Sequence, residues 1–140
     1  MTVRQFNGIA YPIPGIDTAI QVLRPGARWG MTNDKFSDWE DDKGREPPTD
    51  AEIQPELARE IEIFRYFEYE RRRSRGYPLL EDQLDLLYHD IMNGNLENGS
   101  WVKSIAEVKE KFPKPKEPQP DLTPYINYIS ETETDPPVTS

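Results

Sequence analysis

The sequence predicts an α+β protein, in which a small unit made of one N-terminal helix and a β-hairpin precedes a long helix, an αα-hairpin and an extended Pro-rich C-terminal tail. Two alternating apolar segments flank a polar turn near residue 34, and apolar residues recur every three or four positions after residue 49. Beyond residue 112 this periodicity stops, and seven of the 14 prolines follow. We expect four segments, at 1–46, 47–76, 77–112 and 113–140.

The composition is acidic and polar, because 26 Asp and Glu stand against 17 Lys and Arg and only 35% of the residues are hydrophobic. Without cysteine the chain forms neither a disulfide nor a zinc–thiolate site, and a single histidine excludes a His-based metal cluster. The net charge of −9 argues against a nucleic-acid partner. No apolar run approaches the ~18 residues of a membrane span. We expect no enzymatic activity, no cofactor and no membrane partner.

The first segment predicts a mixed unit. Its expected elements are an edge strand at 2–6, a helix at 18–23 and two strands at 28–32 and 36–40. Asp17 is the expected N-cap of the helix. Asn33-Asp34-Lys35 separates the two later strands, which predicts a hairpin with a three-residue loop.

The second segment predicts one amphipathic helix over 49–75. Thr49 and Glu52 form a capping box, which is typical of a helix start. The apolar stripe that follows consists of Ile53, Leu57, Ile61, Phe64 and Phe67. Pro55 either is tolerated in the first turn or splits off a short lead-in. Arg71–Arg75 complement the dipole at the helix end, and Gly76 is the expected left-handed C-cap.

The third segment predicts two helices packed as an αα-hairpin. Pro78 suits the first position of one helix, and Ser100 is the expected cap of the other. Asn93-Gly94-Asn95 separates them. The side chains expected to be mutually buried are Leu84, Leu87, Ile91, Trp101, Ile105 and Val108.

Three clusters of polar residues are candidate catalytic or ion-binding sites, and each has a simpler structural interpretation. His89 lies beside Asp85 and Asp90, but one histidine among acids on a helix is usually a surface residue. The acidic run of Asp38, Glu40, Asp41 and Asp42 lacks the alternating ligands and the glycine of a calcium loop. Arg71–Arg75 are explained by the helix end. We therefore assign no catalytic, cofactor-binding or metal-binding residue.

The tail contains one candidate interaction motif. Within its Pro-rich, acidic sequence lie four residues of the types that anchor interfaces, namely Tyr125, Ile126, Tyr128 and Ile129. We predict that they bind a partner, either in apolar pockets or as an added strand. The alternative is apolar content without a function in a disordered tail.

Two stretches carry a family resemblance. Residues 17–57 combine the helix Asp17–Leu23, a Pro-Gly turn, a hairpin ending in Phe36-Ser37-Asp38-Trp39 and a helix starting Pro48-Thr49-Asp50-Ala51-Glu52-Ile53. This pattern resembles the XkdW family of prophage tail-region proteins. Residues 77–113 begin Tyr77-Pro78-Leu79-Leu80-Glu81-Asp82-Gln83-Leu84-Asp85-Leu86-Leu87-Tyr88-His89-Asp90 and continue with Trp101-Val102-Lys103-Ser104-Ile105 and Val108-Lys109-Glu110-Lys111-Phe112-Pro113. This segment is similar to one that recurs in small proteins and fibre-associated domains of tailed phages.

The resemblance implies a bacteriophage virion structural protein of the tail, baseplate or fibre attachment region. Its expected partners are other phage structural proteins in a multi-copy assembly, and its expected location is the virion, after synthesis in the host cytoplasm. The alternative is a tail-fibre assembly chaperone that is not retained in the virion. A third reading, an acidic DNA mimic, rests on net charge alone, and the interspersed Lys and Arg count against it.

Overall fold

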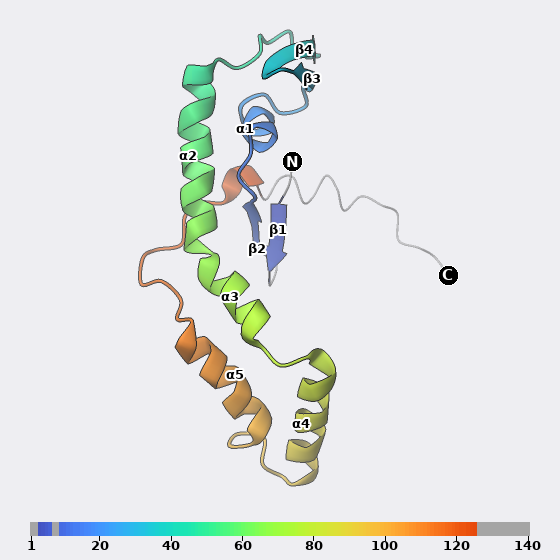
Figure 1. Cartoon of the computed structure of the whole chain (residues 1–140), viewed down its shortest axis with the longest axis vertical. Helices are drawn as coiled ribbons and strands as arrows, with labels where there is room; N and C mark the ends of the chain where they lie inside the picture. Colours follow the sequence, from blue (N-terminus) through green and yellow to red (C-terminus); the bar gives the residue numbers. More distant parts are fainter. Residues whose placement is uncertain (1–2, 7–8, 126–140) are drawn as a thin grey trace, which may run out of the picture. The chain divides into compact units, whose positions relative to one another are not determined.

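A computed structural model describes residues 3–6 and 9–125 of the chain (Figure 1). Two compact units are present, one from Met1–Arg65 with Pro120–Ser140 and the other from Tyr66–Gln119. Helices and two antiparallel hairpins together confirm the α+β class. The elements are β1 (Val3–Phe6), β2 (Ile9–Pro12), α1 (Ile16–Leu23), β3 (Arg28–Thr32), β4 (Lys35–Glu40), α2 (Asp50–Tyr66), α3 (Glu68–Gly76), α4 (Leu80–Met92) and α5 (Ser100–Lys111).

The first unit begins with a β-hairpin, and the sequence predicted only the first of its two strands. β1 pairs with β2 in antiparallel register, from Val3 opposite Pro12 to Phe6 opposite Ile9. The strand expected at 2–6 corresponds to β1, whereas its partner β2 was missed. Ala10 and Tyr11 of β2 are fully buried. Two adjacent buried residues break the alternation from which a half-buried strand is recognised.

Helix α1 starts earlier than predicted. Gly15 occupies the N-cap position in an extended conformation, with no side-chain cap, and Asp17 lies within the first turn. The prediction of Asp17 as N-cap is therefore wrong. An acidic residue in the first turn still interacts favourably with the positive end of the helix dipole, which accounts for Asp17 near this helix start.

The β3–β4 hairpin has a two-residue loop, so the predicted three-residue loop is wrong. Thr32 pairs with Lys35, which leaves only Asn33 and Asp34 between the strands. Both have positive φ angles, 51° and 61°. Asn and Asp tolerate this left-handed conformation, and a turn of this kind matches the twist of the flanking strands.

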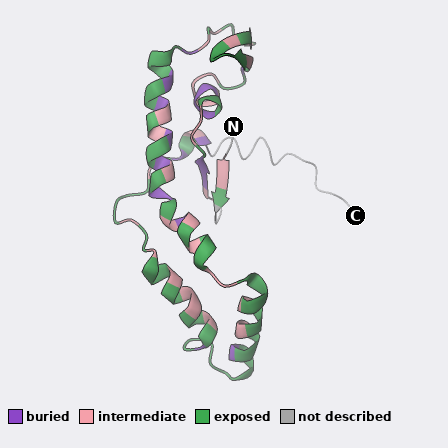
Figure 2. Cartoon of the chain, in the orientation of Figure 1, coloured by how far each residue is buried: buried purple, intermediate pink, exposed green. Residues whose placement is uncertain are grey.

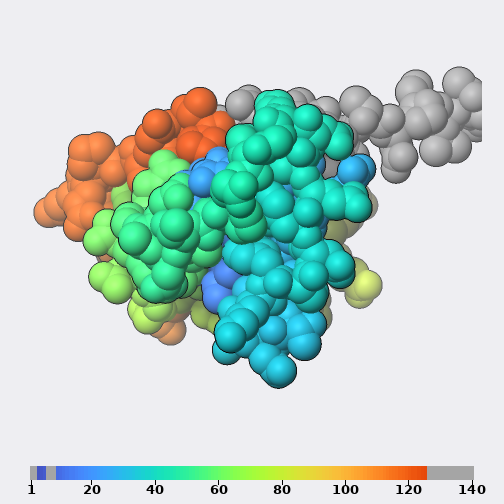
Figure 3. Space-filling view, turned by 90° about the horizontal axis from the view of Figure 1, so that it is seen from above, coloured from blue at the N-terminus to red at the C-terminus, as the bar shows by residue number. Residues whose placement is uncertain are grey.

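The small core of this unit lies where α1, the β3–β4 hairpin and the start of α2 meet. Its buried members are Ala19, Ile20 and Ile53, against which Leu23, Trp29, Phe36 and Trp39 pack. Buried residues are marked in α1, β2 and along α2, whereas α4 and α5 are mostly exposed or intermediate (Figure 2). In the space-filling view, blue atoms of the N-terminal segment show between green α2 and the cyan hairpin (Figure 3).

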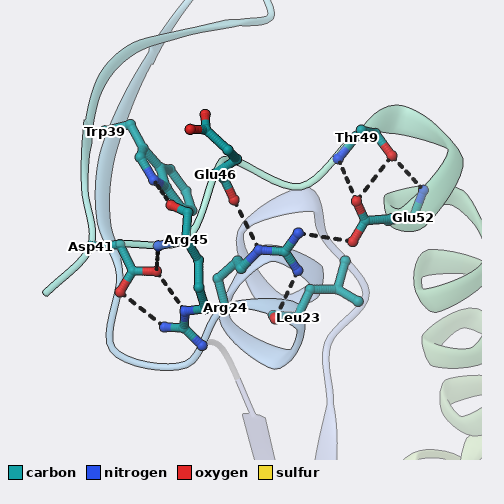
Figure 4. Close-up of polar contacts among 8 residues, drawn as sticks. All are labelled: Leu23, Arg24, Trp39, Asp41, Arg45, Glu46, Thr49 and Glu52. Atoms are coloured by element: carbon teal, nitrogen blue, oxygen red, sulfur yellow. Dashed lines mark hydrogen bonds and ion pairs between the residues drawn. The ribbon is translucent and has the colours of Figure 1, made fainter. Parts of the chain in front are cut away.

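The start of α2 confirms the predicted capping box. Glu52 N–H donates to Thr49 Oγ1 at 3.3 Å, and Thr49 N–H donates to Glu52 Oε1 at 3.3 Å. Arg24, the C-cap of α1, binds the same glutamate through Nη2 at 3.0 Å and the Glu46 carbonyl through Nε at 2.9 Å (Figure 4). The Thr49 backbone N–H and then Arg24 lower the pKa of Glu52. One carboxylate thus joins α1 to α2.

The expected single helix over 49–75 is interrupted, but at Phe67 rather than at Pro55. α2 runs through Pro55 without a break, and helical geometry stops at Phe67, where φ is −85° and ψ is 10°. The Phe67 ring is buried and lies 5.0 Å from the Tyr66 ring and 6.4 Å from the Tyr69 ring. Packing of these aromatic side chains takes precedence over the continuous helical pattern of the sequence.

Gly76 does not form the left-handed C-cap that was predicted. It is the last residue of α3, and the C-cap is Tyr77 in an extended conformation. A Cβ at Gly76 would lie 3.2 Å from Val108 and 3.3 Å from Phe112. The absence of a side chain therefore permits a close approach of α3 to α5.

In the second unit, α4 itself caps α5. Asp90 accepts hydrogen bonds from the backbone N–H of Ser100 at 3.2 Å and of Trp101 at 2.8 Å. The predicted cap, Ser100, is instead the first residue of the helix, after Gly99 at the N-cap position. A Cβ at Gly99 would lie 2.3 Å from the Asp90 carboxylate, so glycine is required there. Pro78, predicted at the first helical position, precedes α4, which starts at Leu80.

The αα-hairpin forms, but the mutual burial predicted for its apolar residues is wrong. Leu84 is 57% exposed and Ile91 is 52% exposed. Trp101, Ile105 and Val108 are only half-buried. Two helices cover one side of each other and leave the remaining apolar positions in solvent.

Among the described residues, no helix is both long enough and apolar enough to cross a membrane.

Replacing Asp90 tests the cross-helix cap. We expect Asp90→Ala to destabilise the start of α5 by about 1–2 kcal/mol, because two backbone donors lose their acceptor. Amide exchange at Ser100 and Trp101 should accelerate about tenfold. The matched control is Asp85→Ala on the same helix, since the Asp85 carboxylate is exposed and its partner is only His89 at 3.5 Å. Equal exchange in both variants would contradict the cap.

Candidate functional site

The buried face of α2 differs from the predicted apolar stripe. Ile53, Glu56, Glu60 and Ile63 are buried, whereas Ile61 is 43% exposed. These buried positions also follow the three-and-four spacing of a helix face. The spacing of a buried face was thus present in the sequence, but two of the four residues are acids, which are seldom fully buried. Two carboxyl groups one turn apart therefore lie in the interior of the first unit.

The Glu56 carboxylate is fully engaged. Arg59 donates to it from Nε at 2.9 Å and from Nη2 at 3.0 Å, a two-point pairing that suits a carboxylate. The Tyr125 hydroxyl donates to Glu56 Oε1 at 2.9 Å, across 69 positions of sequence. The cluster of Glu56, Arg59, Glu60 and Tyr125, here termed the carboxylate cluster, thus joins α2 to the C-terminal end of the described chain.

Glu60 is the unusual member of the carboxylate cluster. Its exposed fraction is 0%, and within the part of the chain that the structure describes neither of its carboxyl oxygens has a hydrogen-bond partner. Burial, and next the Glu56 carboxyl, raise the pKa of Glu60 to about 8, while the Gly15 backbone N–H and Arg59 oppose the shift. At neutral pH this side chain is therefore a neutral acid.

Tyr125, predicted as a partner-binding residue, lies within its own unit. Its exposed fraction is 0%, and that of Leu122 is 5%. Residues 123–125 form a helical turn whose start is held by Asp121, which accepts from Thr123 N at 3.0 Å and from Thr123 Oγ1 at 2.6 Å. The other motif residues, Ile126, Tyr128 and Ile129, lie outside the described residues.

Burial and a hydrogen bond to Glu56 also raise the pKa of the Tyr125 hydroxyl above its usual range. The phenol therefore remains a neutral donor over the whole range in which proteins are handled. The Arg59 guanidinium lies 5.5 Å from the centre of the Tyr125 ring, which adds a cation–π contact to the hydrogen bond.

The acidic run of the β4 end and the following loop is paired with arginines. Arg45 binds Asp41 (Figure 4). Its Nη2 also donates to the Pro25 carbonyl at 2.7 Å. The hydrogen bond from Arg45 lowers the pKa of Asp41 to about 2. Arg28 lies 3.2 Å from Glu40 and 3.4 Å from Asp42. These contacts make the run a structural connection of the hairpin.

His89 has the surroundings of a surface residue. Its side chain is 62% exposed and lies 3.5 Å from Asp85, while Asp90 is used by the backbone of α5. Among the described residues, no group of three or more His, Cys, Asp or Glu side chains is arranged to hold a metal ion.

The arginines of α3 serve the helix and its neighbour. Arg72 pairs with Glu68 at 2.7 Å, as the i,i+4 spacing predicts, and Arg73 donates to the Phe112 carbonyl at 2.7 Å. A groove of about 500 Å³ between α3 and α5 is lined by Arg72, Arg75, Gly76, Glu107, Val108, Lys111 and Phe112. The C-terminal ends of both helices meet there, and their negative dipole ends disfavour an anion.

Most of the exposed large apolar residues among the described residues of the second unit lie on α4 and the residue before it. These residues, here termed the α4 face, are Leu79, Leu80, Leu84, Tyr88, Ile91 and Met92, and each is between 52% and 74% exposed. Exposed acidic residues, Glu81, Asp82 and Asp85, lie on the same helix. Two members of the α4 face, Leu84 and Ile91, were predicted to be buried against α5, and that prediction is wrong.

Comparison of the chain with family models, curated proteins and solved structures finds no match. The resemblance to phage tail-region proteins stays a prediction from the residues quoted above.

The carboxylate cluster predicts an unusual dependence of stability on pH. Because folding raises the pKa of Glu60, the folded state binds a proton between pH ~4.5 and ~8 that the unfolded state releases. The free energy of unfolding should therefore fall with rising pH across this window, by at most about 1.4 kcal/mol per pH unit.

Glu60→Gln mimics the neutral acid, and we expect it to flatten this slope in urea unfolding curves between pH 5 and 8. The matched control, Glu62→Gln on the exposed side of α2, should retain the slope. A slope that is unchanged in Glu60→Gln would contradict a buried neutral acid.

Proposed function

We propose that this protein is a structural component of a tailed-phage virion, in the tail, baseplate or fibre attachment region, and that it acts by protein–protein contacts without catalysis. The observation that carries the proposal is the α4 face. Six large apolar side chains stand in solvent on one short helix and the residue before it. Exposed apolar patches of this kind typically mark binding surfaces in small proteins.

The physical argument is that α5 leaves most of the large apolar side chains of α4 uncovered. α5 covers one side of α4 and has no fully buried residue of its own. The apolar residues of the α4 face gain roughly 25 cal/mol for each Å² that a partner removes from water. A long apolar side chain such as Leu84 is thus worth more in an assembly than in the isolated unit.

The charge of α4 specifies the partner chemistry. Glu81, Asp82 and Asp85 accompany the apolar residues, so the complementary surface is an apolar groove edged with Lys or Arg. We assign this surface to another phage structural protein, in a multi-copy assembly made in the host cytoplasm and retained in the virion. The tail residues Ile126, Tyr128 and Ile129 supply a second contact, as the sequence predicts.

The alternative proposal is a tail-fibre assembly chaperone, which would use the same α4 face for a transient complex. Mass spectrometry of purified, washed virions of the encoding phage separates the two. Stoichiometric peptides in virions support the structural role. Presence in the infected-cell lysate with absence from virions supports the chaperone. If this protein is found only in the lysate and is bound to no phage protein, both the structural role and the chaperone role are contradicted.

Polar substitution on the α4 face should reduce incorporation. We expect Leu84→Ser with Tyr88→Ser to lower the virion-bound amount at least about tenfold, because two interface anchors cost more than 1.4 kcal/mol together. Circular dichroism should be unchanged, since both side chains are already exposed. The matched control is Lys103→Ser with Glu107→Ser on the exposed polar side of α5. Equal incorporation of both double variants would refute the assignment of this face.

Truncation after Tyr125 tests the tail contact separately. It removes Ile126, Tyr128 and Ile129 but retains Leu122 and Tyr125, whose side chains are buried in the first unit. We expect the truncated chain to keep the thermal stability of the full chain and to be incorporated less efficiently. Incorporation at the full-length level would make the tail a passive extension.

A further inference from the structure

The C-terminal turn, defined as residues 122–125, packs on the first unit through two buried side chains. Leu122 and Tyr125 are buried, and the Tyr125 hydroxyl donates to Glu56 at 2.9 Å. The hydrogen bond of Tyr125 ends on Glu56, and its cation–π contact is with Arg59, so both contacts are with the carboxylate cluster on α2. Its attachment therefore depends on the electrostatic state of that cluster.

The carboxylate cluster contains two carboxyl groups and one guanidinium. From α2, Glu56 and Arg59 act on Glu60; from the start of α1, the Gly15 backbone N–H acts on it; and from the C-terminal turn, the Tyr125 hydroxyl faces the same cluster. Arg59 is committed to Glu56 by two hydrogen bonds. An ionised Glu60 would be a second buried negative charge without a counterion of its own.

We propose that the C-terminal turn is a proton-controlled latch: the proton on Glu60 keeps Leu122 and Tyr125 docked on α2, and its loss detaches them and exposes the Tyr125 ring.

The reasoning follows from the cost of burying charge. Ionised Glu60 needs water, because its side chain is fully buried and lies beside the Glu56 carboxylate. The C-terminal turn covers the same cluster, so its departure admits water next to both carboxylates. α1 has anchors outside this cluster, because Arg24 binds the capping box of α2 and Ile20 lies in the apolar core. The polar contacts of the turn are with Glu56 and Arg59, so the turn is the part that an ionised Glu60 releases first.

The pKa of Glu60, about 8 when the turn is docked, sets the range of the latch. Once water reaches the carboxyl group, its pKa returns toward the ordinary value of about 4.3. Opening then releases a proton at neutral pH, so the opening equilibrium constant rises up to about tenfold per pH unit until pH ~8 and levels off above it.

Chymotrypsin cleavage after Tyr125 measures the opening, because the protease needs this ring in its own pocket. The full chain is digested between pH 6 and 9, rates are divided by those of a small peptide substrate at each pH, and products are identified by mass spectrometry. Cleavage after Phe64 within α2 reports unfolding of the whole unit. We expect Tyr125 cleavage to rise at least about tenfold from pH 6 to 8, well ahead of Phe64 cleavage.

Two variants complete the test. Glu60→Gln should cleave slowly at every pH, because its amide cannot ionise. Tyr125→Phe keeps a cleavable ring without the hydrogen bond to Glu56, so it should cleave faster at every pH and keep the pH dependence. The proposal is overturned if wild-type cleavage is independent of pH, if Glu60→Gln follows the wild type, or if Tyr125 and Phe64 cleavage rise together.

If Glu60→Gln fails to fold, an NMR titration of Glu60 in the wild-type chain tests the proposal instead. The ¹³C carboxyl resonance of Glu60, followed in the full chain by NMR, should shift with a midpoint near pH 8, and Tyr125 ring resonances should broaden or shift over the pH range below it. A Glu60 midpoint near the ordinary value of about 4.3 in the folded chain would overturn the latch.

Discussion

The first unit depends on one helix face. Through Phe64, α2 lies 6.1 Å from the ring of Tyr11 in β2; through Ile53 it joins the core formed with α1; and through Glu56 it binds the C-terminal turn. Three segments distant in sequence therefore meet on the same side of α2. The constraint is that this side also contains Glu60, so the packing surface of the whole unit includes an acid that must remain neutral.

Polar contacts to the backbone supplement the limited apolar burial of the αα-hairpin and its neighbour α3. Asp90 caps α5, Arg73 binds the Phe112 carbonyl, and the Gln83 side chain binds the Pro78 carbonyl at 2.8 Å. Such directional contacts fix the hairpin geometry without demanding a large core, which suits a chain with 35% hydrophobic residues. The consequence is that the apolar side of α4 is not needed for folding the hairpin and stays available.

Two local signals were predicted correctly, because neighbouring residues determine them, whereas the caps expected at Asp17, Gly76 and Ser100 were wrong. The Thr49–Glu52 capping box and the Glu68–Arg72 pair need only a helix to form. Contacts between distant segments were not predictable: Asp90 caps a helix ten positions later, and Tyr125 reaches Glu56 across 69 positions. The buried Glu60 was missed for the same reason, since its neighbours come from the start of α1 and from α2 itself.

Two features of this chain are energetically unfavourable, one because apolar groups are exposed and the other because a carboxyl group is buried. Apolar side chains of α4 stand in water, and the Glu60 carboxyl stands inside a core. Both arrangements cost free energy in the isolated chain, and each cost is removed by a different companion. A protein surface of matching shape relieves the first, and a single proton relieves the second. Because water supplies the proton, the buried acid of the first unit needs no other protein, whereas the exposed α4 face would be covered only by the partner that we propose.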